Sequence, residues 1–170
     1  MYRLLIVDDE FMERNALKLL VDRYFENVMV AGEAVTGKEA VQKAQELAPD
    51  IIIMDIKLPG MSGVDASKEI KTLLPEAKII ILTAYNYFNY AQDALKLGID
   101  DFLLKPVPIE KLVICLNSVI DRINEEKEKK NKEQVMKTRY NQMLLQMERE
   151  FISALALEKS SEAKIREYVR

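Results

Sequence analysis

Residues 51–60 of this chain read Ile51-Ile52-Ile53-Met54-Asp55-Ile56-Lys57-Leu58-Pro59-Gly60. Four consecutive apolar residues without alternation are typical of a strand that is buried on both faces of a parallel sheet. The run ends at Asp55, and Pro59 marks the connection that follows. The stretch therefore predicts a central strand that brings one carboxylate to the edge of a sheet.

Four further short apolar runs alternate with segments of helical spacing. With the run above, the predicted strands are residues 4–7, 28–31, 51–54, 79–82 and 102–104, and the predicted helices are residues 11–24, 37–48, 63–74 and 87–98. Thr36 and Ser62 stand where helix N-caps belong, and Gly98 suits a helix C-terminus. This alternation predicts an α/β fold with a doubly wound five-stranded parallel sheet, in which ligands bind beyond the carboxyl ends of the strands.

The composition excludes several kinds of chemistry. Hydrophobic side chains make up 49% and charged side chains 31% of the 170 residues, as in an ordinary globular protein. The net charge of −3 attracts neither nucleic acid nor an anionic membrane surface. The absence of histidine removes Ser/His/Asp and Cys/His catalysis and most zinc sites. The single cysteine, Cys115, allows no internal disulfide. The apolar residues at the start are too few for a signal peptide or a membrane helix. We therefore expect a cytoplasmic protein.

The sequence changes in character from residue 109 onward. It contains no glycine or proline there, and alternating steps of four and three residues follow one heptad frame. The positions of this frame are Leu112, Leu116, Val119, Ile123, Glu126, Lys130, Glu133, Lys137, Tyr140, Leu144, Met147, Phe151 and Ala154. Two apolar blocks are thus linked across a charged middle, residues 125–133, either by one continuous helix, which we favour, or by a frayed linker. We predict one domain over residues 1–122, a coiled-coil linker over residues 123–158 that ends near Ser160-Ser161, and a further helical segment over residues 159–170.

Every candidate reactive residue falls at the carboxyl end of a predicted strand. Asp8 and Asp9 follow the first strand, Asp55 ends the third, Thr83 follows the fourth and Lys105 the fifth. A parallel sheet gathers these ends along one edge, where three carboxylates are costly unless a cation such as Mg²⁺ neutralises them. A metal, a lysine, a hydroxyl and a carboxylate nucleophile are the parts required for phosphoryl transfer to aspartate. Each residue alone would more often be an ordinary turn or cap, so the prediction depends on their order and placement.

These residues lie in four motifs that resemble the response-regulator receiver family. The motifs are Leu5-Ile6-Val7-Asp8-Asp9-Glu10, Ile53-Met54-Asp55-Ile56-Lys57-Leu58-Pro59-Gly60-Met61-Ser62-Gly63, Ile81-Leu82-Thr83-Ala84 and Gly98-Ile99-Asp100-Asp101-Phe102-Leu103-Leu104-Lys105-Pro106. The resemblance covers residues 1–122 and implies a receiver domain with the flavodoxin-like strand order 2-1-3-4-5. It also implies a two-component system, in which a sensor histidine kinase is the phosphoryl donor.

The resemblance implies a role for each residue at the sheet edge. Asp55 would be the phosphoacceptor. Asp9, Asp55 and the backbone carbonyl of Lys57 would bind Mg²⁺ directly, and Asp8 would act mainly through water. Lys105 would pair with the phosphoryl oxygens.

The resemblance also implies a switch. Thr83 would move its hydroxyl onto the phosphoryl group, and the amide of Ala84 would donate a further hydrogen bond. Phe102 occupies the position of the family's switch aromatic and would turn inward as Thr83 moves. The Lys105-Pro106 peptide resembles one that is usually cis in the family, which would aim the lysine inward.

Two further stretches of the sequence predict what the switch controls. Four aromatics in residues 85–91, and the run of residues 144–151, look like receivers of the YesN/AraC-type subfamily, in which a coiled coil precedes a DNA-binding pair of helix-turn-helix units. We therefore expect a homodimer through this helix and an output in transcription regulation. No helix-turn-helix is visible in the 170 residues, so we expect no DNA binding by this chain itself. Either the chain is a piece of a transcription regulator, which we favour, or it is a receiver with only a helical effector.

Two other functions compete with that of a receiver. Aspartyl-phosphate hydrolases of a related α/β fold usually carry an acid two residues after the nucleophile, but here that position is Lys57. We therefore expect self-phosphorylation and self-dephosphorylation, and no enzyme that turns over a substrate. A structural coiled-coil protein with an inert α/β head would keep the helix without the chemistry of Asp55.

Overall fold

The computed structural model describes the backbone of residues 1–84 and 99–168, with the side chains up to residue 150 and that of Ser153. The chain divides into two compact units, Met1–Ile123 and Asn124–Arg170. The helix predicted over residues 87–98, its C-terminal Gly98 and the aromatic residues 85–91 lie outside the described residues.

The first unit is built around a five-stranded parallel sheet. Its strands are β1 (Tyr2–Val7), β2 (Val28–Ala34), β3 (Ile51–Asp55), β4 (Lys78–Thr83) and β5 (Asp101–Leu104), and its helices are α1 (Phe11–Tyr24), α2 (Gly37–Leu47), α3 (Gly63–Leu73) and the start of α5 (Ile109–Tyr168). The strand order is β2-β1-β3-β4-β5, and every neighbouring pair is parallel. The predicted fold class and strand order are confirmed.

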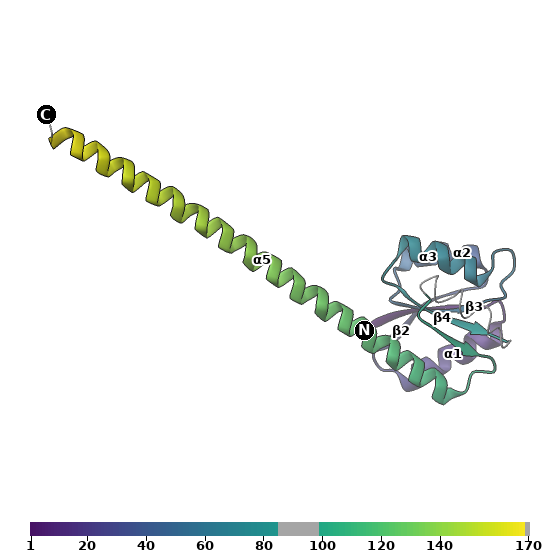
Figure 1. Ribbon diagram of the computed structural model, residues 1–170. Coiled ribbons are helices and arrows are strands. Elements are labelled where there is room, and N and C mark those ends of the chain that lie inside the picture. Colours follow the sequence, from purple (N-terminus) through teal and green to yellow (C-terminus); the bar gives the residue numbers. More distant parts are fainter. Residues whose placement is uncertain (85–98, 169–170) are drawn as a thin grey trace. The chain divides into compact units, whose positions relative to one another are not determined.

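Helices cover both faces of the sheet, with α2 and α3 on one side and α1 and the beginning of α5 on the other (Figure 1). Ile51 and Ile53 belong to the core on the α1 and α5 side, whereas Ile52 and Met54 belong to the core on the α2 and α3 side. Because each face of β3 packs against helices, both sets of alternating side chains must be apolar. This is the physical reason for the continuous run on which the fold prediction was based.

The two predicted N-caps are confirmed. The Oγ1 atom of Thr36 accepts a hydrogen bond from the Glu39 amide at 3.1 Å, and the Oγ atom of Ser62 accepts one from the Asp65 amide at 3.1 Å. Each bond satisfies one of the amide groups that the first turn of a helix leaves without a partner. The caps therefore set where α2 and α3 begin.

Strand β2 is longer than its apolar run predicts. The run ends at residue 31, but β2 continues to Ala34, because Gly32, Glu33 and Ala34 pair with Leu5, Ile6 and Val7 of β1. The pairing register shifts between Leu4 and Leu5, as expected at a β-bulge. Hydrogen bonding to a neighbouring strand thus extends β2 through polar residues that carry no strand signal of their own.

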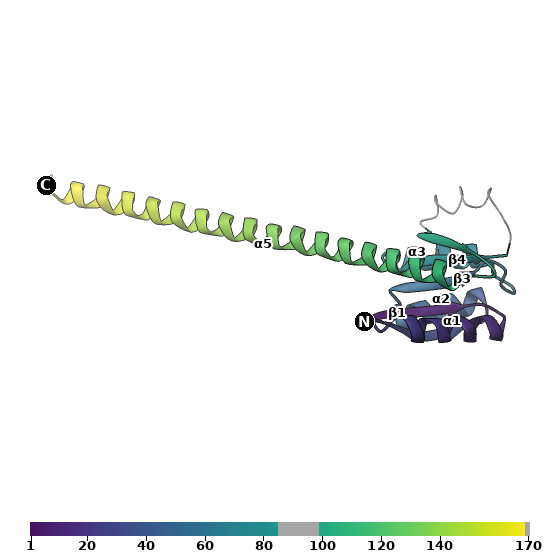
Figure 2. The ribbon, with the colours of Figure 1, turned by 90° about the horizontal axis from the view of Figure 1, so that it is seen from below.

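Helix α5 runs without interruption from Ile109 to Tyr168 (Figure 2). The continuous helix that we favoured over a frayed linker is therefore confirmed. The predicted end near Ser160-Ser161 is wrong, because serine inside a helix costs only a few tenths of a kcal/mol relative to alanine and no glycine or proline stops the helix there. Among the described residues, no helix combines the length and the apolarity needed to cross a membrane.

Candidate functional site

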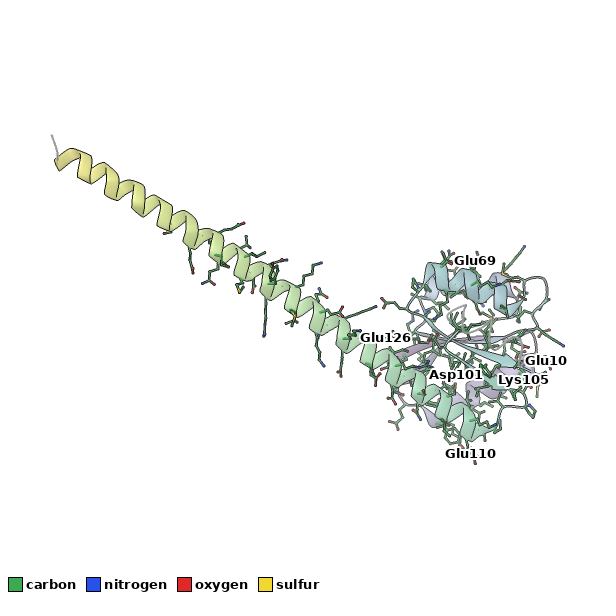
Figure 3. All side chains as sticks on the ribbon, in the orientation of Figure 1. Glu10, Glu69, Asp101, Lys105, Glu110 and Glu126 are labelled. Carbon is green, nitrogen blue, oxygen red and sulfur yellow. The ribbon has the colours of Figure 1, made fainter. Side chains whose placement is uncertain are left out.

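The predicted reactive residues lie together at the carboxyl edge of the sheet. Asp8 follows β1, Asp55 ends β3, Thr83 ends β4 and Lys105 follows β5. Figure 3 shows Glu10 and Lys105, which follow β1 and β5, at the same edge of the sheet. Since all five strands are parallel, the chain leaves each strand at this edge, where the ends of β1, β3, β4 and β5 carry the site residues.

Three carboxylates form the centre of the site. One oxygen from each of Asp8, Asp9 and Asp55 lies within 4.8 Å of the other two. Asp8 is fully buried and Asp55 is 7% exposed, whereas Asp9 is exposed. Three oxygen donors at this spacing, partly withdrawn from water, match the preference of a small hard divalent cation.

Lys105 connects two of the three acids. Its Nζ atom donates to Asp8 Oδ2 at 2.6 Å and to Asp55 Oδ2 at 3.0 Å. Because β4 lies between β3 and β5, the side chain passes over the end of β4 to make these contacts. Burial alone would lower the pKa of Lys105, but the hydrogen bonds to Asp8 and Asp55 and their charges outweigh burial and raise it. The Lys105-Pro106 peptide is cis, as the resemblance to the receiver family implied.

The backbone around Asp55 holds this side chain closely. Asp55 Oδ1 accepts a hydrogen bond from the Lys57 amide at 3.2 Å, while Oδ2 accepts from Lys105. The first residue of α3, Gly63, approaches the end of β3 so closely that a Cβ atom there would lie 1.8 Å from the carbonyl oxygen of Asp55. A side chain at Gly63 would therefore displace the strand end that carries the acid.

The remaining predicted residues lie on β4 and β5 or directly after β4. Thr83 is buried at 9% exposure, and its carbonyl oxygen accepts a hydrogen bond from the Lys105 amide at 2.7 Å. Ala84 is exposed. Phe102 pairs with Ile81 across β4 and β5, and its side chain is 48% exposed. Phe102 thus lies within the strand that leads to Lys105, with its ring partly in solvent.

Sequence reasoning missed one ion pair beside the acidic cluster. Arg14 Nη1 donates to the carbonyl oxygen of Asp8 at 2.9 Å, and Arg14 Nε donates to Glu33 Oε2 at 3.1 Å. The signal was present, because Arg14 has the same helical phase as the buried residues Leu17 and Val21. A charged residue on the buried face of a helix requires a partner of opposite charge. For Arg14 of α1, this partner is Glu33 of β2.

The fold and site define a class: a doubly wound α/β domain whose parallel strands end in an acidic cluster that is bridged by one lysine. Residues 4–117 match the response regulator receiver domain. The chain therefore belongs to the response regulator receiver family of two-component systems, whose members receive phosphoryl groups from sensor histidine kinases.

Individual relatives agree with this assignment. The chain is similar to the chemotaxis protein CheY of Thermotoga maritima, at 44% identity over 117 residues, which are 69% of this chain and 96% of that protein. It is 30% identical over 132 residues to YesN of Bacillus subtilis, an uncharacterized transcriptional regulatory protein, over 78% of this chain and 36% of YesN. Among solved structures, the REC domain of AraT, a response regulator from Geobacillus stearothermophilus, matches with a TM-score of 0.69 and 32% identity, over 74% of this chain and 98% of that chain.

Proposed function

We propose that this chain is a phosphorylation-activated receiver that accepts a phosphoryl group on Asp55. The observation that carries the proposal is the contact of Lys105 Nζ with both Asp8 and Asp55, at 2.6 and 3.0 Å. A nucleophilic carboxylate is thereby placed beside a cationic donor, at an edge where a third acid, Asp9, is open to solvent. Positioning and electrostatic stabilisation of this kind are what phosphoryl transfer requires from a protein.

The proposal includes Mg²⁺ at the acidic cluster. Asp9 and Asp55 would bind the ion directly with the Lys57 carbonyl, and Asp8 would act through water. The fit rests on three oxygen donors within 4.8 Å of one another and on their charge, since the Lys105 amine pairs with Asp8 and Asp55 but not with Asp9. When bound, Mg²⁺ offsets the charge of the carboxylates and of the phosphoryl oxygens.

Transfer would proceed by attack of an Asp55 carboxylate oxygen on the phosphorus of a phosphohistidine. The new P–O bond forms as the P–N bond breaks, and the histidine leaves with its electron pair. Lys105 would exchange its hydrogen bond to Asp55 for one to a phosphoryl oxygen, and its raised pKa keeps it charged at neutral pH. The Thr83 hydroxyl and the Ala84 amide would bind the remaining phosphoryl oxygens.

The proposed switch uses Thr83 and Phe102. Thr83 is buried at the end of β4, and Phe102 lies half-exposed on the neighbouring strand β5. Movement of the Thr83 hydroxyl toward the phosphoryl group would leave space into which the Phe102 ring turns. The surface near β5 would thus differ between the two states.

We further propose a dimeric output through α5. Tyr140, Leu144 and Met147 lie on one heptad frame and are 59%, 42% and 57% exposed, so an apolar stripe of the second unit lacks a cover within the described chain. A second copy would bury this stripe as a coiled coil. In a parallel pair, the frame positions Glu126 and Lys130 would each face a like charge, which would weaken that part of the seam.

The dimer is tested by a matched pair of substitutions. Leu144 lies on the heptad frame, and Leu145, 56% exposed, is the next residue of the helix and lies off the frame. We expect Leu144→Gln to shift sedimentation equilibrium toward monomer and Leu145→Gln to leave it unchanged. Equal effects of the two substitutions would contradict the proposed seam.

Transcription regulation is the proposed purpose of the switch. It is supported by the match to YesN, and it corresponds to the YesN/AraC-type assignment made from the sequence. The chain itself would act by protein contacts rather than by binding DNA, and it would catalyse only its own phosphorylation and dephosphorylation. A cytoplasmic location is part of the proposal and suits the free, buried thiol of Cys115.

The receiver chemistry is tested by intact mass after incubation with Mg²⁺ and acetyl phosphate. We expect one added phosphoryl group, lost in Asp55→Asn and lost without Mg²⁺. If no adduct accumulates, binding of beryllofluoride distinguishes rapid hydrolysis from an inert head. Failure to bind beryllofluoride would leave the competing function, an inert scaffold that acts through its coiled coil.

A further inference from the structure

Arg14 is a buried cation next to the acidic cluster that the proposed chemistry does not use. Its side chain is 11% exposed and donates two hydrogen bonds, one to the Asp8 carbonyl and one to Glu33, and its guanidinium lies over the Phe11 ring at 5.7 Å. Arg14 belongs to α1, Asp8 follows β1 and Glu33 belongs to β2. One guanidinium therefore links three elements at the point where β1 reaches the site.

The contact to Asp8 constrains a particular peptide. The carbonyl oxygen that accepts from Arg14 belongs to the peptide group between Asp8 and Asp9, so the bond fixes how this plane is turned. The same rigid plane contains the Asp9 amide nitrogen and Cα atom, so the bond restrains the backbone from which the Asp9 side chain departs.

The two acids differ in how they are held. The Asp8 carboxylate is fixed on both oxygens, by the Glu10 amide on Oδ1 at 2.9 Å and by Lys105 on Oδ2. For the Asp9 carboxylate, the described part of the chain offers no hydrogen bond and no ion pair, and the side chain is exposed. Asp9 is therefore restrained through its backbone, to which Arg14 is linked by the hydrogen bond to the Asp8 carbonyl.

We propose that Arg14 is a positioning residue for the divalent-ion site, and that it acts by orienting Asp9 through the Asp8–Asp9 peptide. Glu33 serves as the second anchor that holds the guanidinium in this orientation. The inference rests on the proposed Mg²⁺ site. The competing interpretation is an ion pair that only stabilises the packing of α1 on β2.

The chain supplies a matched control for this distinction. Lys18 lies one turn further along α1, and its Nζ atom is 3.9 Å from Glu33 Oε1. Lys18 has the same charge as Arg14 and pairs with the same acid, Glu33. Lys18→Ala therefore removes a positive charge from the same helix and weakens the same ion-pair group, but leaves the bond to the Asp8 carbonyl in place.

The experiment measures Mg²⁺ affinity by isothermal titration calorimetry on the full chain, with folding checked by circular dichroism. Loss of a residue that orients a metal ligand typically weakens metal binding by about 10- to 100-fold. We expect a loss of this size for Arg14→Ala and a change below about twofold for Lys18→Ala. Arg14→Lys keeps the charge but has only one nitrogen for two partners, so its affinity should fall between these two values.

Each outcome decides the proposal. An Arg14→Ala protein that folds and binds Mg²⁺ within about twofold of the parent would overturn it, as would an equal loss in Lys18→Ala. If Arg14→Ala does not fold, Arg14→Lys takes its place, and an affinity equal to that of the parent then overturns the inference. A parent chain that binds no Mg²⁺ would instead remove the proposed metal site itself, which is a separate result.

Discussion

Replacing Lys105 with methionine tests the electrostatics of the site directly. Methionine keeps an unbranched side chain but removes the amine that bridges Asp8 and Asp55. Removing one partner of a buried ion pair costs about 3–5 kcal/mol, because the other charge stays buried without compensation. Lys105 is 13% exposed and Asp9 is open to water, so water can enter part of the space that the lysine amine leaves. We therefore expect the lower end, about 3 kcal/mol.

That loss is readily measured. In a domain of this size, 1 kcal/mol corresponds to roughly 3–4 °C, so the unfolding midpoint should fall by about 10 °C in EDTA. Mg²⁺ would supply the missing positive charge, so the rise in Tm on adding Mg²⁺ should be larger in Lys105→Met than in the parent. Thermal and urea unfolding, followed by circular dichroism, measure both quantities.

The pH dependence has a definite sign. The folded-state pKa of Lys105 is raised above its ordinary value of 10.5, so its contribution to stability is fully present below that pH. It is lost as the pH rises through the folded-state pKa. The stability difference between the parent and Lys105→Met should therefore stay constant from pH 7 to about 9 and shrink above 10.5.

The control is Lys111→Met, which removes an exposed lysine from the start of α5. We expect this change to alter stability by less than about 0.5 kcal/mol. The reasoning is refuted if Lys105→Met is as stable as the parent in EDTA, or if the two substitutions cost the same.

Three further outcomes follow from single contacts. Gly63→Ala should destabilise the first unit by at least about 2 kcal/mol in urea unfolding, since its Cβ atom would lie 1.8 Å from the Asp55 carbonyl oxygen. Unchanged stability would mean that α3 can shift away from the end of β3 at no cost in free energy. Ser62→Ala should cost about 1 kcal/mol by the same measurement, because the cap of α3 is lost, and no loss would show that water replaces the cap. Burial, together with the nearby charge of Asp101, raises the pKa of the Cys115 thiol to about 12. At pH 8 the thiol should therefore react with Ellman's reagent only as fast as the protein unfolds, and a rate near that of free cysteine would contradict its burial.

Much of the site could be predicted because each reactive residue directly follows a strand that its own apolar run identifies. Asp8, Asp55, Thr83 and Lys105 are examples, and the structure places them at one edge of the sheet. Their convergence needs only the rule that parallel strands end together. Thr36 and Ser62 were predictable for a similar local reason, since a cap bonds an amide within its own first turn.

The misses have non-local causes. Strand β2 continues past its apolar run because β1 pairs with Glu33 and Ala34, a partnership that no window of sequence contains. The helix end expected near Ser160-Ser161 relied on a weak local preference, which the rest of the helix overrides.

The sequence by itself determined the succession of the five strands with α1, α2 and α3 and the acids and lysine at the strand ends, and it favoured the continuous helix that follows. These features depend on periodicity, caps and chain breaks, which act over a few residues. Only the tertiary structure decided that Lys105 bonds both Asp8 and Asp55, and that Arg14 bonds both Glu33 and the carbonyl next to Asp9. Such contacts form between side chains that are distant in sequence, so they depend on how α1 and the strands pack, which determines the direction in which each charge points.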